Sequence, residues 1–370
     1  MMKKLFSFLL MVVMVVCLFA GCGEPRDATE GDDVPISSVI KKVALITECL
    51  SIDDGAYNQA CWEGVVSWCD SCGIEYVYYQ PEEDSNDARV ASTRQAIEEG
   101  ANVIVMPGYL FGTTLIEVQE QYPDVYFLAV DVGDGDMTYD YVDYYVPTDN
   151  AVCMTFAEEQ AGYLAGYAAV KEGYTQLGFY GGMAVPAVIR YGFGFVQGAD
   201  DAAREMDVNI HIKYSYEGFC CGHDDEPRKL MGWIEDGTEL LFLCGGAMPA
   251  RYAEKLNAQI IACDVDISHI SPNILTSAKK ELKTAVEYAL TVLHEGRWET
   301  ELGGRFVNLT LQDGDYVGLP SSDESFRFQT FTMEEYEGVK ADIRKGIKTV
   351  SSAFEYMPTV SWNTTIEEIG

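Results

Sequence analysis

Short apolar runs rich in β-branched residues alternate with longer amphipathic segments along most of this chain. Such alternation is typical of strand–helix–strand units, whose right-handed crossovers build a parallel sheet with helices on both faces. We therefore expect an α/β fold based on doubly wound parallel sheets. The first run predicts strands at 42–47, 74–79, 102–106 and 125–130, and helices at 57–72, 86–100 and 112–121.

A second run of the same alternation follows residue 150 and predicts a second lobe. A chain of 370 residues is long enough for two domains of about 150 residues each. Its predicted elements are helix 153–171, strand 176–181, helix 186–205, strand 208–215, helix 225–236, strand 239–243, helix 248–256 and strand 259–263.

Further helices are predicted at 278–295 and 333–347, with a glycine-rich, strand-like stretch between them. Elements added after two α/β units indicate that the chain returns to the first lobe and then to the second, through a hinge of several strands. We expect an N-terminal lobe of residues 41–150 plus about 275–312, a C-terminal lobe of 151–274 plus about 313–350, and a C-terminal tail over 351–370.

The excess of acidic residues in the chain excludes some classes of partner. With 25 basic and 59 acidic residues, the formal net charge is −34, and this field repels phosphate backbones and anionic lipid headgroups. We therefore expect no nucleic-acid partner. Nucleotides are also disfavoured, because the sequence has no dense cluster of lysine and arginine to oppose the field. Neutral or cationic small molecules are the favoured ligands.

Residues 1–21 have the features of an export signal. Two lysines precede an apolar run over 5–20, which is shorter than the roughly 20 residues that a membrane span needs. A pair of small residues before Cys22 is the pattern that is cleaved when the cysteine carries lipid. We expect a lipidated Cys22, a flexible tether over 22–40 and a protein anchored on the extracytoplasmic face of a bacterial cell membrane. A plain signal peptide and an uncleaved anchor are the alternatives.

The cysteines leave a redox or metal role as a minor alternative. Of 11 cysteines, nine remain after the signal and the lipidation site are set aside, so at least one should be a free thiol. Cys69 and Cys72 have redox or metal spacing, but they share a helical stripe with Cys61, where cysteine behaves as a small buried hydrophobe. The acidic stretch 131–136 lacks the spacing of a calcium loop. We expect neither a metal nor a cofactor.

Sequence motifs for catalysis are missing. There is no G-x-S-x-G, no H-E-x-x-H and no G-x-x-x-x-G-K-[ST], and the chain has four histidines. The glycines of 192–198 miss dinucleotide spacing and lie in a helical pattern. The small residues of 159–169 also have helical spacing and are expected to let that helix approach a sheet closely. We therefore expect a binding protein rather than an enzyme.

Ligands of open α/β sheets lie beyond the carboxyl ends of the strands. After the first predicted strand, the segment 51–64 joins an acidic pair to Tyr57 and Asn58 at the start of a helix. Asp53 or Asp54 can cap that helix, which is the purely structural interpretation. In the functional interpretation the aromatic ring stacks on a planar ligand and Asn58 hydrogen-bonds its edge. The other loops at strand ends are 107–112, 131–136, 181–186, 216–223, 245–248 and 264–266.

Several motifs in a fixed order resemble the basic membrane protein family of substrate-binding lipoproteins, whose best-understood relatives are purine nucleoside receptors. The resemblance covers about 42–350. The motifs are KVALIT with IDDGAYNQACWEG, YPDVYFLAVD, EEQAGYLAGYAA, GFYGGMAVPAVIRYGFGFVQGA, LFLCGGA, CDVD, LTSAKK and LQDGDYVGL. The resemblance implies a type I periplasmic-binding-protein fold, a nucleoside held between two lobes, and delivery to the permease of an ABC importer. We expect the protein to be a monomer.

The resemblance also implies roles for individual residues. Two rings would sandwich the base, Tyr57 from the first-helix motif and Phe219 from the second lobe, and two residues would read its edge, Asn58 and Asp131. Glu48 replaces the Asp usual in the family, and the CGGAMP loop departs from the family pattern, so the ligand could be another nucleoside or another small polar solute. The residues expected to bind the ligand are Asp54, Tyr57, Asn58, Asp131, Phe219, Gly246, Asp264 and Lys280, the last three near the ribose.

Two other functions remain open on the sequence. The same fold could bind a sugar-like or signalling molecule. Weak or absent ribose contacts at Asp264 and Lys280 would favour this function. An enzyme, such as a nucleosidase or a thiol oxidoreductase using Cys69 and Cys72, would release product from inosine or guanosine.

Overall fold

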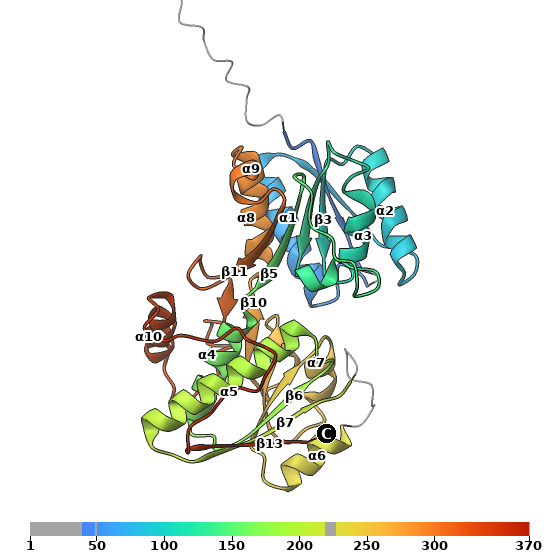
Figure 1. Ribbon diagram of the computed structural model, residues 1–370. Coiled ribbons are helices and arrows are strands. Elements are labelled where there is room, and N and C mark those ends of the chain that lie inside the picture. Colours follow the sequence, from blue (N-terminus) through green and yellow to red (C-terminus); the bar gives the residue numbers. More distant parts are fainter. Residues whose placement is uncertain (1–38, 49, 219–226, 370) are drawn as a thin grey trace, which may run out of the picture. The chain divides into compact units, whose positions relative to one another are not determined.

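A computed structural model describes residues 39–48, 50–218 and 227–369, and within them the strands form two separate sheets (Figure 1). The first sheet is parallel throughout. Among the described residues its six strands lie in the order β11 (Arg305–Leu309), β5 (Ala151–Phe156), β4 (Tyr126–Val130), β3 (Val103–Pro107), β1 (Lys42–Ile46) and β2 (Glu75–Tyr79).

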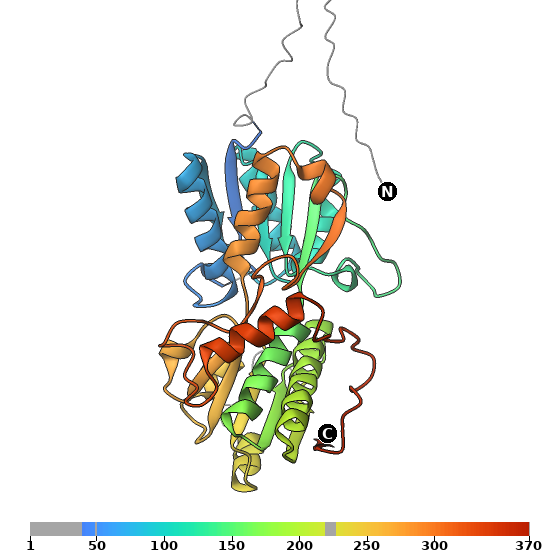
Figure 2. The same ribbon diagram turned by 90° about the vertical axis from the view of Figure 1, so that its left-hand side faces the viewer.

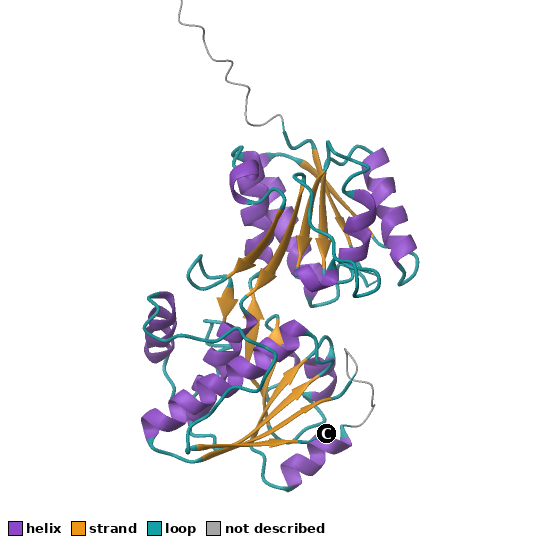
Figure 3. Cartoon of the chain, in the orientation of Figure 1, coloured by secondary structure: helices purple, strands orange, loops and turns teal. Residues whose placement is uncertain are grey.

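The second sheet is parallel except for its short edge strand β12, which runs antiparallel to β10. Figure 3 shows both sheets with helices against them. Among the described residues its seven strands lie in the order β12 (Val317–Gly318), β10 (Ile274–Lys280), β9 (Gln259–Asp264), β8 (Leu240–Cys244), β6 (Gln176–Gly181), β7 (Ile210–Tyr216) and β13 (Thr364–Glu368). The expected α/β fold with doubly wound sheets is confirmed.

The helices alternate with these strands along the chain. None of the helices in the described ranges combines the length and the apolar character needed to cross a bilayer. The helices are α1 (Tyr57–Cys72), α2 (Asn86–Glu98), α3 (Phe111–Val118), α4 (Glu158–Glu172), α5 (Pro186–Met206), α6 (Arg228–Glu235), α7 (Met248–Tyr252), α8 (Leu282–His294), α9 (Trp298–Glu301) and α10 (Met333–Arg344), with 3-10 turns η2 (Asp134–Asp136) and η3 (Ser268–Ile270).

Each sheet buries apolar side chains on both faces, because successive residues of a strand point to opposite sides. On β1, Val43 and Leu45 belong to the core that includes α1 and α8, whereas Ala44 and Ile46 belong to the core under α2 and α3. The second sheet repeats this arrangement, with α4 and α5 on one face and α6 and α7 on the other. We call the two sheets with their helices the first lobe and the second lobe.

Helices α4 and α5 approach each other closely through glycines. A Cβ placed on Gly162 would lie 2.1 Å from the carbonyl oxygen of Tyr191, and one on Gly198 would lie 1.9 Å from that of Tyr163. Gly166 and Gly194 face the partner helix in the same way. The expectation that the small residues of 159–169 serve an approach to a sheet is therefore wrong at these positions, because they meet a neighbouring helix.

Two predicted helices begin too early. The structure forms strand β5 over Ala151–Phe156, where a helix over 153–171 was expected, and strand β10 over Ile274–Lys280, where a helix was expected from 278. In both places an apolar or small-residue run continues into a helix without glycine or proline to mark the boundary. The chain passes between the sheets directly after β5, β10 and β11.

The chain ends with strand β13, which pairs in parallel with β7 at the edge of the second sheet. The segment that leads to β13 runs along α5, where Ser351 N donates to Gln197 Oε1 and Ser361 N to Asp200 Oδ1. The C-terminal residues are thus part of the second lobe.

Candidate functional site

A buried lysine joins acidic residues from both lobes. The ammonium group of Lys280, whose side chain is 2% exposed, lies 2.9 Å from both carboxylate oxygens of Asp131, 3.1 Å from Glu158 Oε1 and 3.5 Å from Asp264 Oδ1. Burial alone would lower the pKa of Lys280, but the charges of Asp131, Glu158 and Asp264 outweigh it and hold that pKa well above its usual value. Lys280 is therefore charged, and we call these four residues the Lys280 cluster.

Two of the three acidic residues lie at the ends of strands. Asp131 follows β4 in the first sheet, and Asp264 ends β9 in the second. Both have positive φ angles, 62° and 67°, a conformation that costs an ordinary L-residue about 1–2 kcal/mol. Such strain is concentrated at functional sites, where the surrounding structure holds the residue in place. Ligands of such sheets bind beyond the carboxyl ends of the strands, and this rule selects the same two side chains, one in each lobe.

Tyr57, the first residue of α1, completes this group. Its hydroxyl oxygen accepts a hydrogen bond from Lys280 Nζ at 2.8 Å, and the hydroxyl donates to Asp131 Oδ2 at 2.7 Å. Asp264 Oδ1 lies 3.4 Å from the same hydroxyl. Burial, followed by the charges of Asp131 and Asp264, raises the pKa of Tyr57 well above its usual value, so the hydroxyl keeps its proton.

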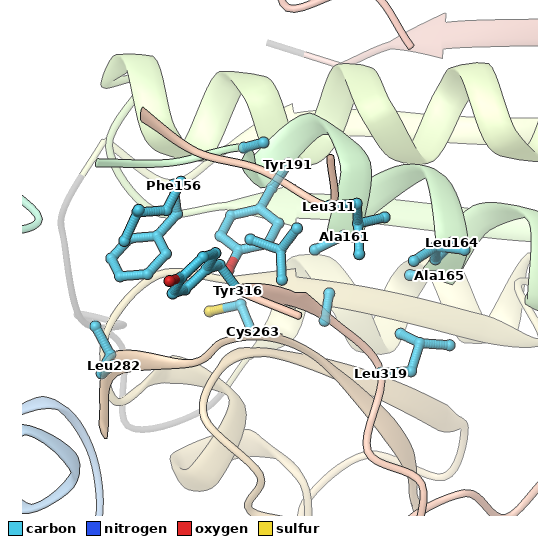
Figure 4. Close-up of a cluster of buried hydrophobic side chains, with 14 of the residues drawn as sticks. Phe156, Ala161, Leu164, Ala165, Tyr191, Cys263, Leu282, Leu311, Tyr316 and Leu319 are labelled. Carbon is cyan, nitrogen blue, oxygen red and sulfur yellow. The ribbon is translucent and has the colours of Figure 1, made fainter. Parts of the chain in front are cut away.

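Aromatic rings surround the lysine. Its ammonium nitrogen lies 5.6 Å from the centre of the Tyr57 ring, 5.8 Å from that of Phe156 and 5.7 Å from that of Tyr191. Figure 4 shows Phe156 and Tyr191 in one apolar cluster with Cys263. Ring faces attract cations, and they exclude water from the ion pairs beside them. The site thus combines charged groups with flat apolar surfaces.

Glu158 and Arg190 are site residues that sequence reasoning missed. Glu158 begins α4 directly after the chain leaves β5, and it is fully buried. One of its oxygens accepts a hydrogen bond from Arg190 Nε at 2.7 Å, and the other faces Lys280. The sequence did contain a signal for Glu158, because Glu158 and Glu159 follow directly on an apolar run. A carboxylate buried there requires a cationic partner.

Asp54 and Asn58 hold the start of α1. The Asp54 carboxylate accepts hydrogen bonds from the backbone N–H groups of Ala56, Asn58 and Gln59, and from the Asn58 side-chain amide at 2.9 Å. Asn58 is 1% exposed, and within the described part of the chain its Oδ1 has no hydrogen-bond partner. Asp54 therefore caps the helix, and Asn58 presents a buried, unpaired acceptor.

Two expected site residues, Gly246 and Phe219, are not among those that the described contacts bring to the Lys280 cluster. Gly246 belongs to the loop between β8 and α7, and with Gly245 it has a positive φ angle, which lets the backbone turn sharply. Phe219, Cys220, Cys221 and His223 lie outside the described residues, as does Cys22. The structure thus brings together Tyr57, Asp131, Asp264 and Lys280 of the expected residues.

Glu159 is expected to give stability a pH dependence. Burial raises the pKa of its carboxyl group from the usual 4.5 to about 7, and the neighbouring charge of Glu158 adds to this rise. Between these two values the folded state holds a proton that the unfolded state has released, so the free energy of unfolding falls as the pH rises. We expect Glu159→Gln to remove about 1–3 kcal/mol of this loss between pH 5 and 8, measured by urea denaturation at both pH values.

The exposed Glu254→Gln serves as a control for this measurement and should keep the wild-type dependence on pH. Other acids, such as the partly buried Glu48, whose pKa burial raises to about 7, are present in both variants, so their effects cancel in the comparison. An unchanged slope in Glu159→Gln would show that this carboxyl group is not the source.

The two sheets, each with an aspartate of positive φ at a strand end, and the three passages between them define an α/β protein of the type I periplasmic-binding-protein fold. Residues 40–355 match the model of the Bmp family, described as ABC transporter substrate-binding protein PnrA-like. The chain belongs to this family, and it is therefore a substrate-binding protein of an ABC transporter and not an enzyme. The expected resemblance is confirmed.

Relatives of known name agree with this assignment. Basic membrane protein A2 of Borrelia garinii subsp. bavariensis is 26% identical over 331 residues, which cover 87% of this chain and 90% of the relative. The ABC transporter nucleoside-binding protein BmpA of Lactococcus lactis subsp. cremoris is 24% identical over 381 residues, which cover 95% of this chain and all of that protein.

Solved structures show the same fold. An ABC transporter solute-binding protein from Conexibacter woesei superposes with a TM-score of 0.65 at 21% identity, covering 85% of this chain and 100% of the other. The lac repressor bound to ONPF superposes with a TM-score of 0.51 at 15% identity, covering 77% of this chain and 99% of the other.

Proposed function

We propose that this protein captures a nucleoside, most simply a purine nucleoside, between its two lobes and delivers it to the permease of an ABC importer. The observation that carries the proposal is the meeting of Tyr57, Asp131, Asp264 and Lys280 in one hydrogen-bonded group at the carboxyl ends of strands from both lobes. The nucleoside-binding relative from Lactococcus lactis supports the choice of ligand.

The chemistry of the group suits such a ligand. The ring of Tyr57 offers a stacking face, and the unpaired Oδ1 of Asn58 is an acceptor for an N–H of a base. Asp131 and Asp264 accept hydrogen bonds from amino or hydroxyl groups through lone pairs that the lysine leaves free. Three carboxylates around one ammonium group disfavour an anionic ligand, so a nucleoside fits better than a nucleotide.

We further propose that the lobes close on the ligand and that the importer recognises the closed form. The passages after β5, β10 and β11 are the natural hinge, with lobe boundaries close to residues 157, 281 and 310–316. The protein would be a monomer held on the extracytoplasmic face by a lipidated Cys22. The relatives named basic membrane proteins and an uncharacterised lipoprotein of Pyrococcus abyssi support that location.

Stacking by Tyr57 is tested by two substitutions at one position. Tyr57→Ala should weaken inosine binding at least tenfold, because base–aromatic stacking contributes about 1–3 kcal/mol. Tyr57→Phe keeps the ring and should retain more of the affinity. Isothermal titration calorimetry of both variants provides the measurement, and Tyr356→Ala, at an exposed tyrosine, is the control. Wild-type affinity in Tyr57→Ala would contradict the proposal.

The alternative is the same fold with another small polar solute. A thermal-shift screen of the protein against nucleosides, free bases and sugars separates the two. If a sugar alone stabilises the protein, the proposed ligand becomes a sugar, and the proposed role in an importer is unchanged.

A further inference from the structure

A short loop between β4 and β5 exposes six large apolar side chains. We call it the tyrosine loop (residues 138–146), and Figure 2 shows the green chain between these strands extending from the first lobe. Tyr141 is 79% exposed and Val142 is 75% exposed. The other exposed apolar residues are Tyr139, Tyr144, Tyr145 and Val146. Exposed tyrosines gathered in this way are typical of protein interfaces.

The tyrosine loop is held in one conformation by its own hydrogen bonds. Thr138 Oγ1 accepts from the N–H of Tyr141 at 2.9 Å, and Asp140 Oδ1 accepts from the N–H groups of Val142 and Asp143. Tyr145 N donates to Met137 O at 2.8 Å. Tyr141 has a φ of 58°, which an L-residue adopts at a cost. The exposed rings therefore belong to a fixed surface, which loses little conformational entropy on binding.

The tyrosine loop lies in an acidic part of the sequence. The sequence has no lysine, arginine or histidine between Arg94 and Lys171. Within the loop the carboxylates of Asp140 and Asp143 are exposed between the tyrosines. Anionic lipid headgroups are repelled by such a surface, and two copies of the loop repel each other. The complementary partner is a protein surface with arginine or lysine, which can pair with the carboxylates and stack on the rings.

We propose that the tyrosine loop is a docking surface for basic extracytoplasmic loops of the membrane subunits of the ABC importer. The inference rests on the importer partnership of the chain and does not depend on the identity of its ligand. The surface lies on the first lobe alone, so it would make contact whether or not ligand is bound. Ligand-dependent recognition would then be added by other contacts.

Photo-cross-linking of the full lipoprotein in membranes of cells that carry its importer tests the proposal. Tyr144→p-benzoyl-phenylalanine is expected to cross-link to an importer membrane subunit, identified by mass spectrometry. Adding Asp143→Lys should lower the yield at least tenfold, because it places a cation opposite the basic partner. Tyr356→p-benzoyl-phenylalanine, at a still more exposed tyrosine of the second lobe, should give no such product.

Transport provides the second readout. Tyr141→Ser combined with Tyr144→Ser should lower importer-dependent uptake of labelled inosine at least tenfold, with unchanged inosine affinity and thermal midpoint. The control, Tyr356→Ser with Trp362→Ser, should transport normally. Normal uptake by the loop variant, or cross-links only to a second copy or to lipid, would overturn the proposal. If wild-type protein takes up no inosine, the ligand proposal fails, and the cross-link still decides the docking surface.

Discussion

Lys280→Met is expected to lower the free energy of unfolding by about 3–5 kcal/mol, because it leaves the carboxylates of Asp131 and Asp264 without their cation and Glu158 with Arg190 alone. Ligand binding should be lost as well, since Asp131 and Tyr57 are both positioned by the ammonium group. Urea denaturation and calorimetric titration with inosine give the two measurements. The deficit in stability should be smaller at pH 5 than at pH 8, because the freed carboxyl groups can then take up protons.

The adjacent Lys279→Met is the matched control. Lys279 lies on the same strand, but its ion pair with Glu281 is partly exposed, and such pairs contribute about 1 kcal/mol or less. A loss in Lys280→Met no larger than in Lys279→Met would show that the Lys280 cluster does not stabilise the fold.

Gly198→Ala is expected to lower the free energy of unfolding by about 1–3 kcal/mol or more, because the added methyl group would overlap a backbone carbonyl of α4. Helix α4 carries Glu158 and helix α5 carries Arg190, so separating the helices should also weaken this ion pair and lower ligand affinity. Thermal and urea denaturation give the first effect, and titration with inosine gives the second.

Gly338→Ala on α10 is the control for this substitution. A methyl group there meets open space, and alanine favours a helix over glycine by about 1 kcal/mol, so this variant should be at least as stable as the wild type. Equal behaviour of the two variants would show that the glycines are not needed for the approach of α4 to α5.

The sequence predicts most elements of both sheets but not the strands at which the chain changes lobe. Short continuous apolar runs identify β1 and β3, which are bounded by turns. β5 and β10 merge directly into helices. Each of them also pairs with a later strand, β11 or β12, for which the sequence offers only a glycine-rich, strand-like stretch. Glycine spacing likewise indicates that α4 packs closely, but only the fold shows that its neighbour is α5.

The site could be predicted in part for the same reason. Asp131 and Asp264 follow clear strands, so the strand-end rule identifies them. Glu158 follows a strand that was interpreted as helix, and its position beside Lys280 depends on two passages between lobes meeting at one point. A buried ion pair between residues 158 and 280 is set by tertiary structure, and no local pattern in the sequence encodes it.

The pairing of β13 with β7 has a practical consequence for shortened forms of the protein. A chain cut at residue 355, where the match to the family ends, would lose β13 and leave the N–H and C=O groups of β7 bare at a sheet edge. Bare edges recruit strands from other molecules and lead to aggregation. By pairing with β7, strand β13 keeps this edge from pairing with other molecules, and recombinant forms should retain it.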